Sequence, residues 1–166
     1  MAEAVARKKV SITVNGVLQE KEVDVRLLLV DFIRRDVGLK GTHVGCEQGV
    51  CGACTILLDG EAVRSCLTLA VQAEGRSVTT IEAMGTPDNM HPIQEAFQEN
   101  HGLQCGFCTP GIVMSVCSFL NDNQNPSDEE IRESLSGNLC RCTGYQNIIK
   151  SVQCAAEKMK EVQVVK

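Results

Sequence analysis

Four cysteines in the first half of the chain are spaced as ligands of a metal cluster. They follow the pattern C-x4-C-x2-C-x11-C and are Cys46, Cys51, Cys54 and Cys66. The C-x4-C-x2-C part is the spacing of plant-type [2Fe-2S] sites, whereas zinc more often uses C-x2-4-C pairs with a distant second pair or with histidines. Three thiolates within nine residues must curl around one object, which requires the positive φ and close backbone approach of glycine, here Gly45, Gly49 and Gly52. The spacing predicts a [2Fe-2S] cluster, with zinc as the alternative.

A second set of four cysteines lies in the other half of the chain. It consists of a C-x2-C pair and, after a gap of 31 residues, a C-x-C pair, made by Cys105, Cys108, Cys140 and Cys142. Thr109-Pro110 follows the first pair and Thr143 follows the second, which predicts that each pair lies at the start of a helix. Positive helix ends favour the reduced, more negative form of a cluster. Tetrahedral zinc also fits this spacing, so the second set alone leaves both metals open.

The other reactive side chains form no site of their own. Cys117 and Cys154 fall inside predicted helices among apolar neighbours, as free cysteines in a core do. The histidines have no metal-ligand spacing, and we expect loop or surface positions for His43, His91 and His101. The sequence has neither a nucleophile–base pattern nor a phosphate-binding glycine loop. We therefore expect an electron carrier without a substrate-binding active site.

A sheet is predicted to position the first cysteine set. Alternating apolar and polar residues at 10–14 and 17–25, joined by Asn15-Gly16, predict a β-hairpin. A short helix follows over 26–36 and is closed by Val37-Gly38. Residues 41–54 have neither period and form the cysteine loop, and further strands are expected at 55–58, 63–67 and 77–81.

The second cysteine set is predicted to lie among helices. The run Gly85-Thr86-Pro87-Asp88 breaks the strand pattern, so we place a boundary near 84–89 and divide the chain into domains 1–84 and 85–166. Helices are expected at 92–100 and 110–120, and a third begins at Ser127, which has capping-box spacing with Glu130. A fourth is expected over 144–161, with Thr143 and Gln146 as a second capping box.

Composition excludes several classes of protein. Ten cysteines in 166 residues are about 6%, below the roughly 8–10% of a short secreted disulfide scaffold. With no secretory signal in residues 1–9, we expect a cytoplasmic location. No apolar run approaches the roughly 20 residues of a membrane span, and a net charge of -5 disfavours nucleic acid or anionic lipid as partner. The expected partners are proteins.

Three cysteine motifs occur in order along the chain. They are GCEQGVCGAC at 45–54, QCGFCTPG at 104–111 and GNLCRCTGY at 137–145. Together they resemble the iron–sulfur subunit of the molybdenum hydroxylases, the family of xanthine dehydrogenase, aldehyde oxidoreductase, aerobic carbon monoxide dehydrogenase and bacterial enzymes that hydroxylate N-heteroaromatic rings. The resemblance covers residues 10–158, and no cluster ligand is missing.

The resemblance implies an α+β fold and a place in an electron-transfer chain. A β-grasp domain like plant ferredoxin would precede an all-α four-helix bundle with pseudo-two-fold symmetry around its cluster. A molybdenum-binding large subunit and an FAD-binding medium subunit would complete a heterotrimer or a dimer of heterotrimers. Single electrons would pass from the molybdenum-pterin centre to the second-set cluster, then to the first-set cluster and FAD, with Gln104 and Cys142 near the pterin.

Two other functions fit the cysteine content less well. A stand-alone carrier would resemble a soluble ferredoxin with an added cluster domain, and a stable monomer that exchanges electrons with several unrelated partners would favour it. The added cluster domain argues against this alternative. A zinc-stapled interaction module would be colourless and would contain no acid-labile sulfide. The two cluster-type spacings favour the electron-transfer subunit over both.

Overall fold

The chain begins with the predicted hairpin. The computed structural model describes residues 6–164, and in it β1 (Arg7–Val14) pairs antiparallel with β2 (Val17–Asp24). Asn15 and Gly16 form the two-residue turn with φ of 50° and 79°. Both central residues of a type I′ turn need positive φ, so asparagine followed by glycine suits this turn.

The helix expected at 26–36 is shorter than predicted and contains a π turn. Helix α1 (Leu29–Asp31) passes directly into a π-helical turn at Phe32–Asp36. Residues 25–26 form a turn. Leu28 stays extended because it forms a bridge with Leu69, and Leu29 N donates to the carbonyl oxygen of Thr68 at 2.7 Å. The predicted end of the helix at Gly38 is confirmed, since the φ of Gly38 is 90°.

Five strands form one mixed sheet in the order β2-β1-β5-β3-β4. Its other members are β3 (Thr55–Leu58), β4 (Glu61–Arg64) and β5 (Ser77–Thr79), with β5 parallel to β1 and antiparallel to β3. The bounds predicted for the strand at 63–67 are wrong. Leu58 pairs with Glu61 across a tight turn, so β4 starts earlier, and Ser65–Leu67 form a 3-10 turn. The strand predicted at 77–81 ends at Thr79, before a 3-10 turn at Ile81–Ala83.

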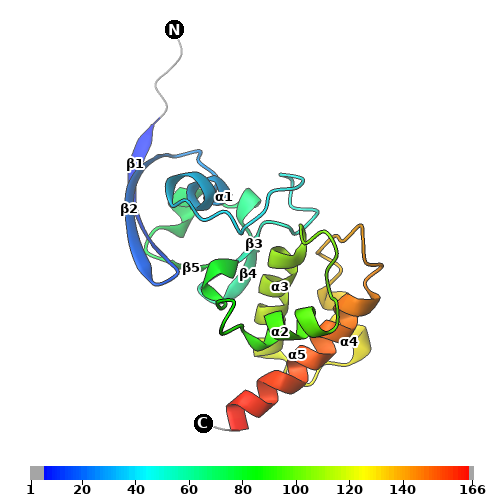
Figure 1. The fold of residues 1–166 in the computed structure, drawn as a ribbon. Coiled ribbons are helices and arrows are strands. Elements are labelled where there is room, and N and C mark those ends of the chain that lie inside the picture. The colour runs from blue at the N-terminus through cyan, green and yellow to red at the C-terminus, as the bar shows by residue number, and fades with distance from the viewer. Residues whose placement is uncertain (1–5, 165–166) are drawn as a thin grey trace.

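One hydrophobic core lies between this sheet and α1 (Figure 1). Alternate residues of the strands meet the α1 and π-turn side chains there: Val10, Ile12, Val14, Ile56, Leu58, Val78, Leu29, Phe32 and Ile33. Burying alternate strand residues on one face is the usual arrangement of a sheet covered on that side.

Up to residue 164, the second half contains four helices, α2 (Pro92–Glu99), α3 (Thr109–Asp122), α4 (Asp128–Ser134) and α5 (Gln146–Val164). The capping box of Ser127 and Glu130 is confirmed at α4. The one predicted for Thr143 and Gln146 is wrong, because Gly144 and Tyr145 have left-handed φ of 62° and 66° and delay the start of α5 to Gln146. Cys108, rather than Thr109, is the N-cap of α3 and caps no N–H through its side chain.

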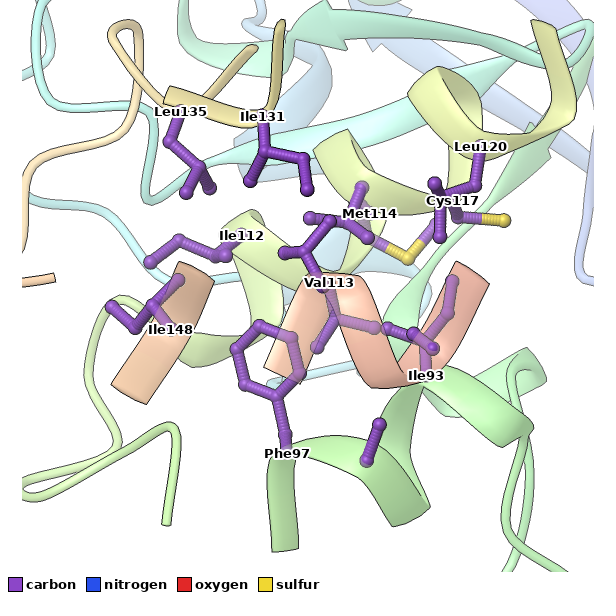
Figure 2. Close-up of a cluster of buried hydrophobic side chains, with 14 of the residues drawn as sticks. Ile93, Phe97, Ile112, Val113, Met114, Cys117, Leu120, Ile131, Leu135 and Ile148 are labelled. Atoms are coloured by element: carbon purple, nitrogen blue, oxygen red, sulfur yellow. The ribbon is translucent and has the colours of Figure 1, made fainter. Parts of the chain in front are cut away.

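A second hydrophobic core lies between these helices (Figure 2). It is built by apolar side chains of all four, including Ile93, Phe97, Ile112, Val113, Met114, Leu120, Ile131, Ile148 and Val152. Leu57 of β3 belongs to this core, whereas its neighbours Ile56 and Leu58 belong to the sheet core. Strand β3 is therefore buried on both faces and joins the two halves.

The architecture is thus mixed α and β, with a five-stranded sheet followed by a helical part. The boundary expected near 84–89 stays a prediction. Within residues 6–164, no helix is long and apolar enough to cross a membrane.

Candidate metal centres

Three cysteines of the first set, Cys46, Cys51 and Cys54, lie in the irregular loop before β3. Cys46 and Cys51 are partly exposed, and Cys51 N donates to Cys46 Sγ at 3.3 Å. The predicted positive φ is found at Gly49 (79°) and Gly52 (71°). Gly45 lacks it and serves the close approach instead, because a Cβ there would lie 2.9 Å from Cys51 Sγ.

Cys54 and Cys66 close the first set from the buried side. Cys54 directly precedes β3, and Cys66 lies in the 3-10 turn that follows β4. Ser65 fixes this turn, since its hydroxyl donates to the carbonyl oxygen of Cys54 at 2.6 Å. The pairing of β3 with β4 therefore brings two distant cysteines together.

The surroundings of Cys46 and Cys66 shift the pKa values of the two thiols in opposite directions. Backbone N–H groups of Gln48 and Cys51 lower the pKa of Cys46 to about 6. Burial and the adjacent Cys54 thiol raise the pKa of Cys66 to about 11. Hydrogen bonds from N–H groups stabilise a thiolate, and burial without a cation destabilises it. Bound iron would provide the missing positive charge for Cys66.

This difference predicts a pH-dependent order of alkylation in the cluster-free protein. A pKa of about 6 makes Cys46 mostly thiolate at neutral pH, whereas the pKa of Cys66 keeps it protonated until about pH 11. Because only the thiolate reacts, iodoacetamide should label Cys46 half-maximally near pH 6 and leave Cys66 unlabelled at neutral pH. Peptide mass spectrometry after timed labelling measures both rates, and equal rates at pH 7 would contradict the prediction.

The second cysteine set lies on two loops of the helical part, one before α3 and one before α5. Cys105 and Cys142 are exposed, with their Sγ atoms 3.5 Å apart. Cys108 caps α3, and Cys140 is buried with its Sγ 3.1 Å from Thr143 Oγ1. The predicted position at a helix start is confirmed for Cys108 but not for Cys142, which three non-helical residues separate from α5.

Burial and hydrogen bonds shift the pKa values of the two inner cysteines, Cys108 and Cys140, in opposite directions. Burial raises the pKa of Cys108 to about 12, with the Cys140 thiol as a further cause. Burial also acts against the Cys140 thiolate, but hydrogen bonds from the Thr143 hydroxyl and from the Cys142 and Thr143 N–H groups lower its pKa overall. Cys140 is therefore the better preorganised anion of the two.

The thiols of the second set border a cavity of about 340 Å³. Cys46 and Cys51 of the first set line the same cavity. In the part of the chain described, no three metal-binding side chains converge closely enough to enclose one ion. A [2Fe-2S] cluster spreads its four thiolates over two bridged irons and needs a wider opening. The residues present fit such a cluster.

Hydrogen bonds join the two cysteine loops directly. Leu139 N donates to the carbonyl oxygen of Cys51 at 2.9 Å, and Asn138 Nδ2 donates to that of Gly52 at 3.2 Å. Arg64 Nη2 donates to the carbonyl oxygen of Gly137 at 2.6 Å. We call this contact, made by Arg64, 51–52 and 137–139, the loop junction. Sequence reasoning missed it, although Gly137-Asn138-Leu139 directly precedes the C-x-C pair.

Comparison with known proteins decides the family. Residues 12–79 match the family described as 2Fe-2S iron-sulfur cluster binding domain, and residues 80–153 match the [2Fe-2S] binding domain family. The chain is 56% identical to caffeine dehydrogenase subunit gamma of Pseudomonas sp. (strain CBB1), covering 94% of this chain and 97% of that one. It is 53% identical to the nicotine 6-hydroxylase small subunit of Paenarthrobacter nicotinovorans, covering 88% of each. The chain belongs to the iron–sulfur subunits of the molybdenum hydroxylases.

Solved structures agree with this assignment. Quinoline 2-oxidoreductase from Pseudomonas putida 86 has a chain that is 48% identical to this iron–sulfur subunit, with a TM-score of 0.88 over 93% of this chain and 97% of that one. Aldehyde oxidoreductase from Desulfovibrio gigas is 44% identical with a TM-score of 0.89, covering 93% of this chain but 17% of that one. The same fold thus occurs both as a separate chain and as part of a longer one.

Tyr145 holds the C-x-C loop of the iron–sulfur subunit in place. Its hydroxyl accepts from Cys140 N at 2.8 Å and donates to the carbonyl oxygen of Asn138 at 3.0 Å. The structure shows a hydroxyl that links the backbone on both sides of Leu139.

The histidines and the two remaining cysteines lie outside the two cysteine sets. His43 stacks on Phe107 with ring centroids 4.9 Å apart, and its Nδ1 donates to the Phe107 carbonyl oxygen at 2.7 Å. His91 is the N-cap of α2 and its Nδ1 accepts from Ile93 N, while His101 follows the C-cap Asn100 with a φ of 52°. The thiols outside the two sets are the buried Cys117 and the half-buried Cys154. Gln104 is exposed next to Cys105, and its role stays a prediction.

Proposed function

We propose that this chain carries single electrons between redox cofactors on two partner subunits. The observation that supports this most directly is the cavity shared by both cysteine sets. Electron transfer requires neighbouring centres, and thiols of both sets border this one space. In the complex, the clusters would supply one-electron transfer from a molybdenum-pterin centre, through the second set and then the first, to FAD.

The ligands we propose are the eight cysteines of the two sets, four to each cluster. One cluster would be held by Cys46, Cys51, Cys54 and Cys66. The other would be held by Cys105, Cys108, Cys140 and Cys142. Cys105 and Cys142 form the exposed edge of the second set beside Gln104, so we propose that this edge faces the pterin. We also propose that α2, α3, α4 and α5 form a four-helix bundle with pseudo-two-fold symmetry around the second cluster.

Exposed apolar side chains near each set support the presence of large partners. Val50 and Leu67 lie by the first set, with exposed fractions of 68% and 61%, and Leu103, Phe107 and Leu139 lie by the second. Apolar side chains gathered beside functional groups mark surfaces for binding other proteins. We propose a molybdenum-binding large subunit and an FAD-binding medium subunit, assembled in the cytoplasm as a heterotrimer or a dimer of heterotrimers.

We further propose that the complex hydroxylates an N-heteroaromatic ring. The relatives of 56% and 53% identity are named for caffeine and nicotine, and the solved structure of 48% identity is named for quinoline. The aldehyde oxidoreductase subunit of Escherichia coli is 43% identical, covering 90% of this chain and 72% of that one. The two relatives above 50% identity are both named for N-heteroaromatic compounds, and they favour this substrate class.

Anaerobic purification of the native complex tests this function. We expect the chain to co-purify with two larger subunits and to contain about four irons and four inorganic sulfides. Assays with purines, pyridines, quinolines and aldehydes would then rank the substrates. Purification as a lone monomer would favour the stand-alone carrier, and zinc without inorganic sulfide would favour the interaction module; either result would overturn the proposal.

A further inference from the structure

Thr143 contacts a cysteine of the second set through its side chain. Its Oγ1 lies 3.1 Å from Cys140 Sγ. The same oxygen accepts a hydrogen bond from Tyr145 N at 3.1 Å. Since α5 begins only at Gln146, this hydroxyl does not cap the helix as its position in the sequence suggests.

The direction of the contact follows from the chemistry of a metal-bound thiolate. A cysteine that binds iron has lost its proton, so its sulfur can only accept. The hydroxyl must then donate to Cys140 Sγ. The N–H of Tyr145 occupies a lone pair of Thr143 Oγ1, which leaves the hydroxyl hydrogen free to point at the sulfur.

The surrounding turn holds this hydroxyl in one place. Gly144 and Tyr145 have left-handed φ values, and the Tyr145 hydroxyl holds Cys140 N on one side and the Asn138 carbonyl on the other. Thr143 and Cys140 are therefore fixed relative to each other by three hydrogen bonds that involve Tyr145.

We propose that Thr143 is a positioning residue that raises the reduction potential of the second-set cluster by donating a hydrogen bond to Cys140 Sγ. The inference deepens the proposed function and rests on Cys140 as a ligand. Reduction adds one electron to the cluster, and the hydroxyl proton stays on Thr143. A donor near sulfur stabilises the extra negative charge, and hydrogen bonds to cluster sulfurs are among the factors that set such potentials.

Thr109 provides a matched control. It follows Cys108 as Thr143 follows Cys142, so each threonine comes directly after the last cysteine of a pair. Thr109 is the first residue of α3, and within the described range its hydroxyl forms no hydrogen bond with a cysteine. Replacing it by valine changes the same group near the same cysteine set without removing a donor to sulfur.

The experiment is a redox titration of the native complex followed by electron paramagnetic resonance. The variants are Thr143→Val, Thr143→Ser and Thr109→Val, and a Cys66→Ser variant assigns the first-set signal. We expect Thr143→Val to lower the midpoint potential of the second-set signal by roughly 60 mV, the one-electron equivalent of a tenfold change in the reduction equilibrium constant. Thr143→Ser and Thr109→Val should stay near the wild-type value, and the first-set signal should not move.

Each other outcome counts against the proposal. A wild-type potential in Thr143→Val with both signals present, or an equal fall in Thr143→Ser, would overturn it. If Thr143→Val assembles no second cluster, Thr143→Ala takes its place in the titration, and loss of the cluster there too would show that the hydroxyl is purely structural. A wild-type complex without a second [2Fe-2S] signal would instead refute the ligand assignment and the proposed function.

Discussion

The Cys142→Ser variant is expected to stop turnover while leaving the first-set cluster intact. Cys142 lies at the exposed edge of the second set, with its Sγ 3.5 Å from that of Cys105. Changes around metal ligands typically cost 10–100-fold in metal affinity or activity, so loss of a ligand itself should lower turnover by more than about 100-fold. Steady-state assays of the complex measure this loss. Low-temperature electron paramagnetic resonance should show the first-set signal unchanged.

A second cysteine substitution separates ligand loss from general damage. Cys154 is half-buried in α5 and belongs to neither set, and its Sγ lies 3.9 Å from Glu99 Oε2. Cys154→Ser should keep both signals and near wild-type turnover. Full turnover in Cys142→Ser would refute the proposed relay through the second set, since electrons would then bypass it.

The Gly52→Ala variant is expected to lose both stability and iron. Its φ of 71° is left-handed, and a Cβ there would lie 2.5 Å from the Gly137 carbonyl oxygen and 2.6 Å from Asn138 Nδ2. The left-handed conformation costs an alanine roughly 1–2 kcal/mol, and forcing apart packed groups adds roughly 1–3 kcal/mol. Because the atoms displaced belong to the loop junction, cysteines on both sides should shift. Thermal denaturation and iron analysis measure the two effects.

Gly75 provides the control for backbone strain alone. Its φ is also 71°, but a Cβ there would meet no atom within 4 Å. Gly75→Ala should therefore cost only the roughly 1–2 kcal/mol of the left-handed conformation and should keep its iron. Equal destabilisation of the two variants would mean that the loop junction yields without cost, contrary to the prediction.

The loop junction explains why glycine is needed where the two halves meet. The Gly52 carbonyl oxygen accepts from Asn138 Nδ2, and a Cβ on Gly111 of α3 would lie 2.3 Å from that same oxygen. Three segments far apart in the sequence thus meet at backbone distance. Any side chain on Gly52 or Gly111 would separate the first cysteine loop from the helical part.

Local patterns predicted much of the fold and the composition of both cysteine sets. The turn at Asn15-Gly16 and the capping box at Ser127 are correct, because each depends on the conformation of a few consecutive residues. The errors lie where distant contacts override such signals. Thr143 has capping-box spacing with Gln146, yet its hydroxyl turns to Cys140, and α5 starts later.

The sequence by itself determined which residues are chemically able to hold clusters, because cysteine spacing is a property of the chain alone. Only the tertiary structure decided how the two sets face each other. Cys51 and Leu139 are joined by a hydrogen bond across the loop junction, and strand β3 is buried between two cores. Contacts of this kind pair residues far apart in the sequence. The residues next to either partner along the chain do not indicate which distant residue it will contact.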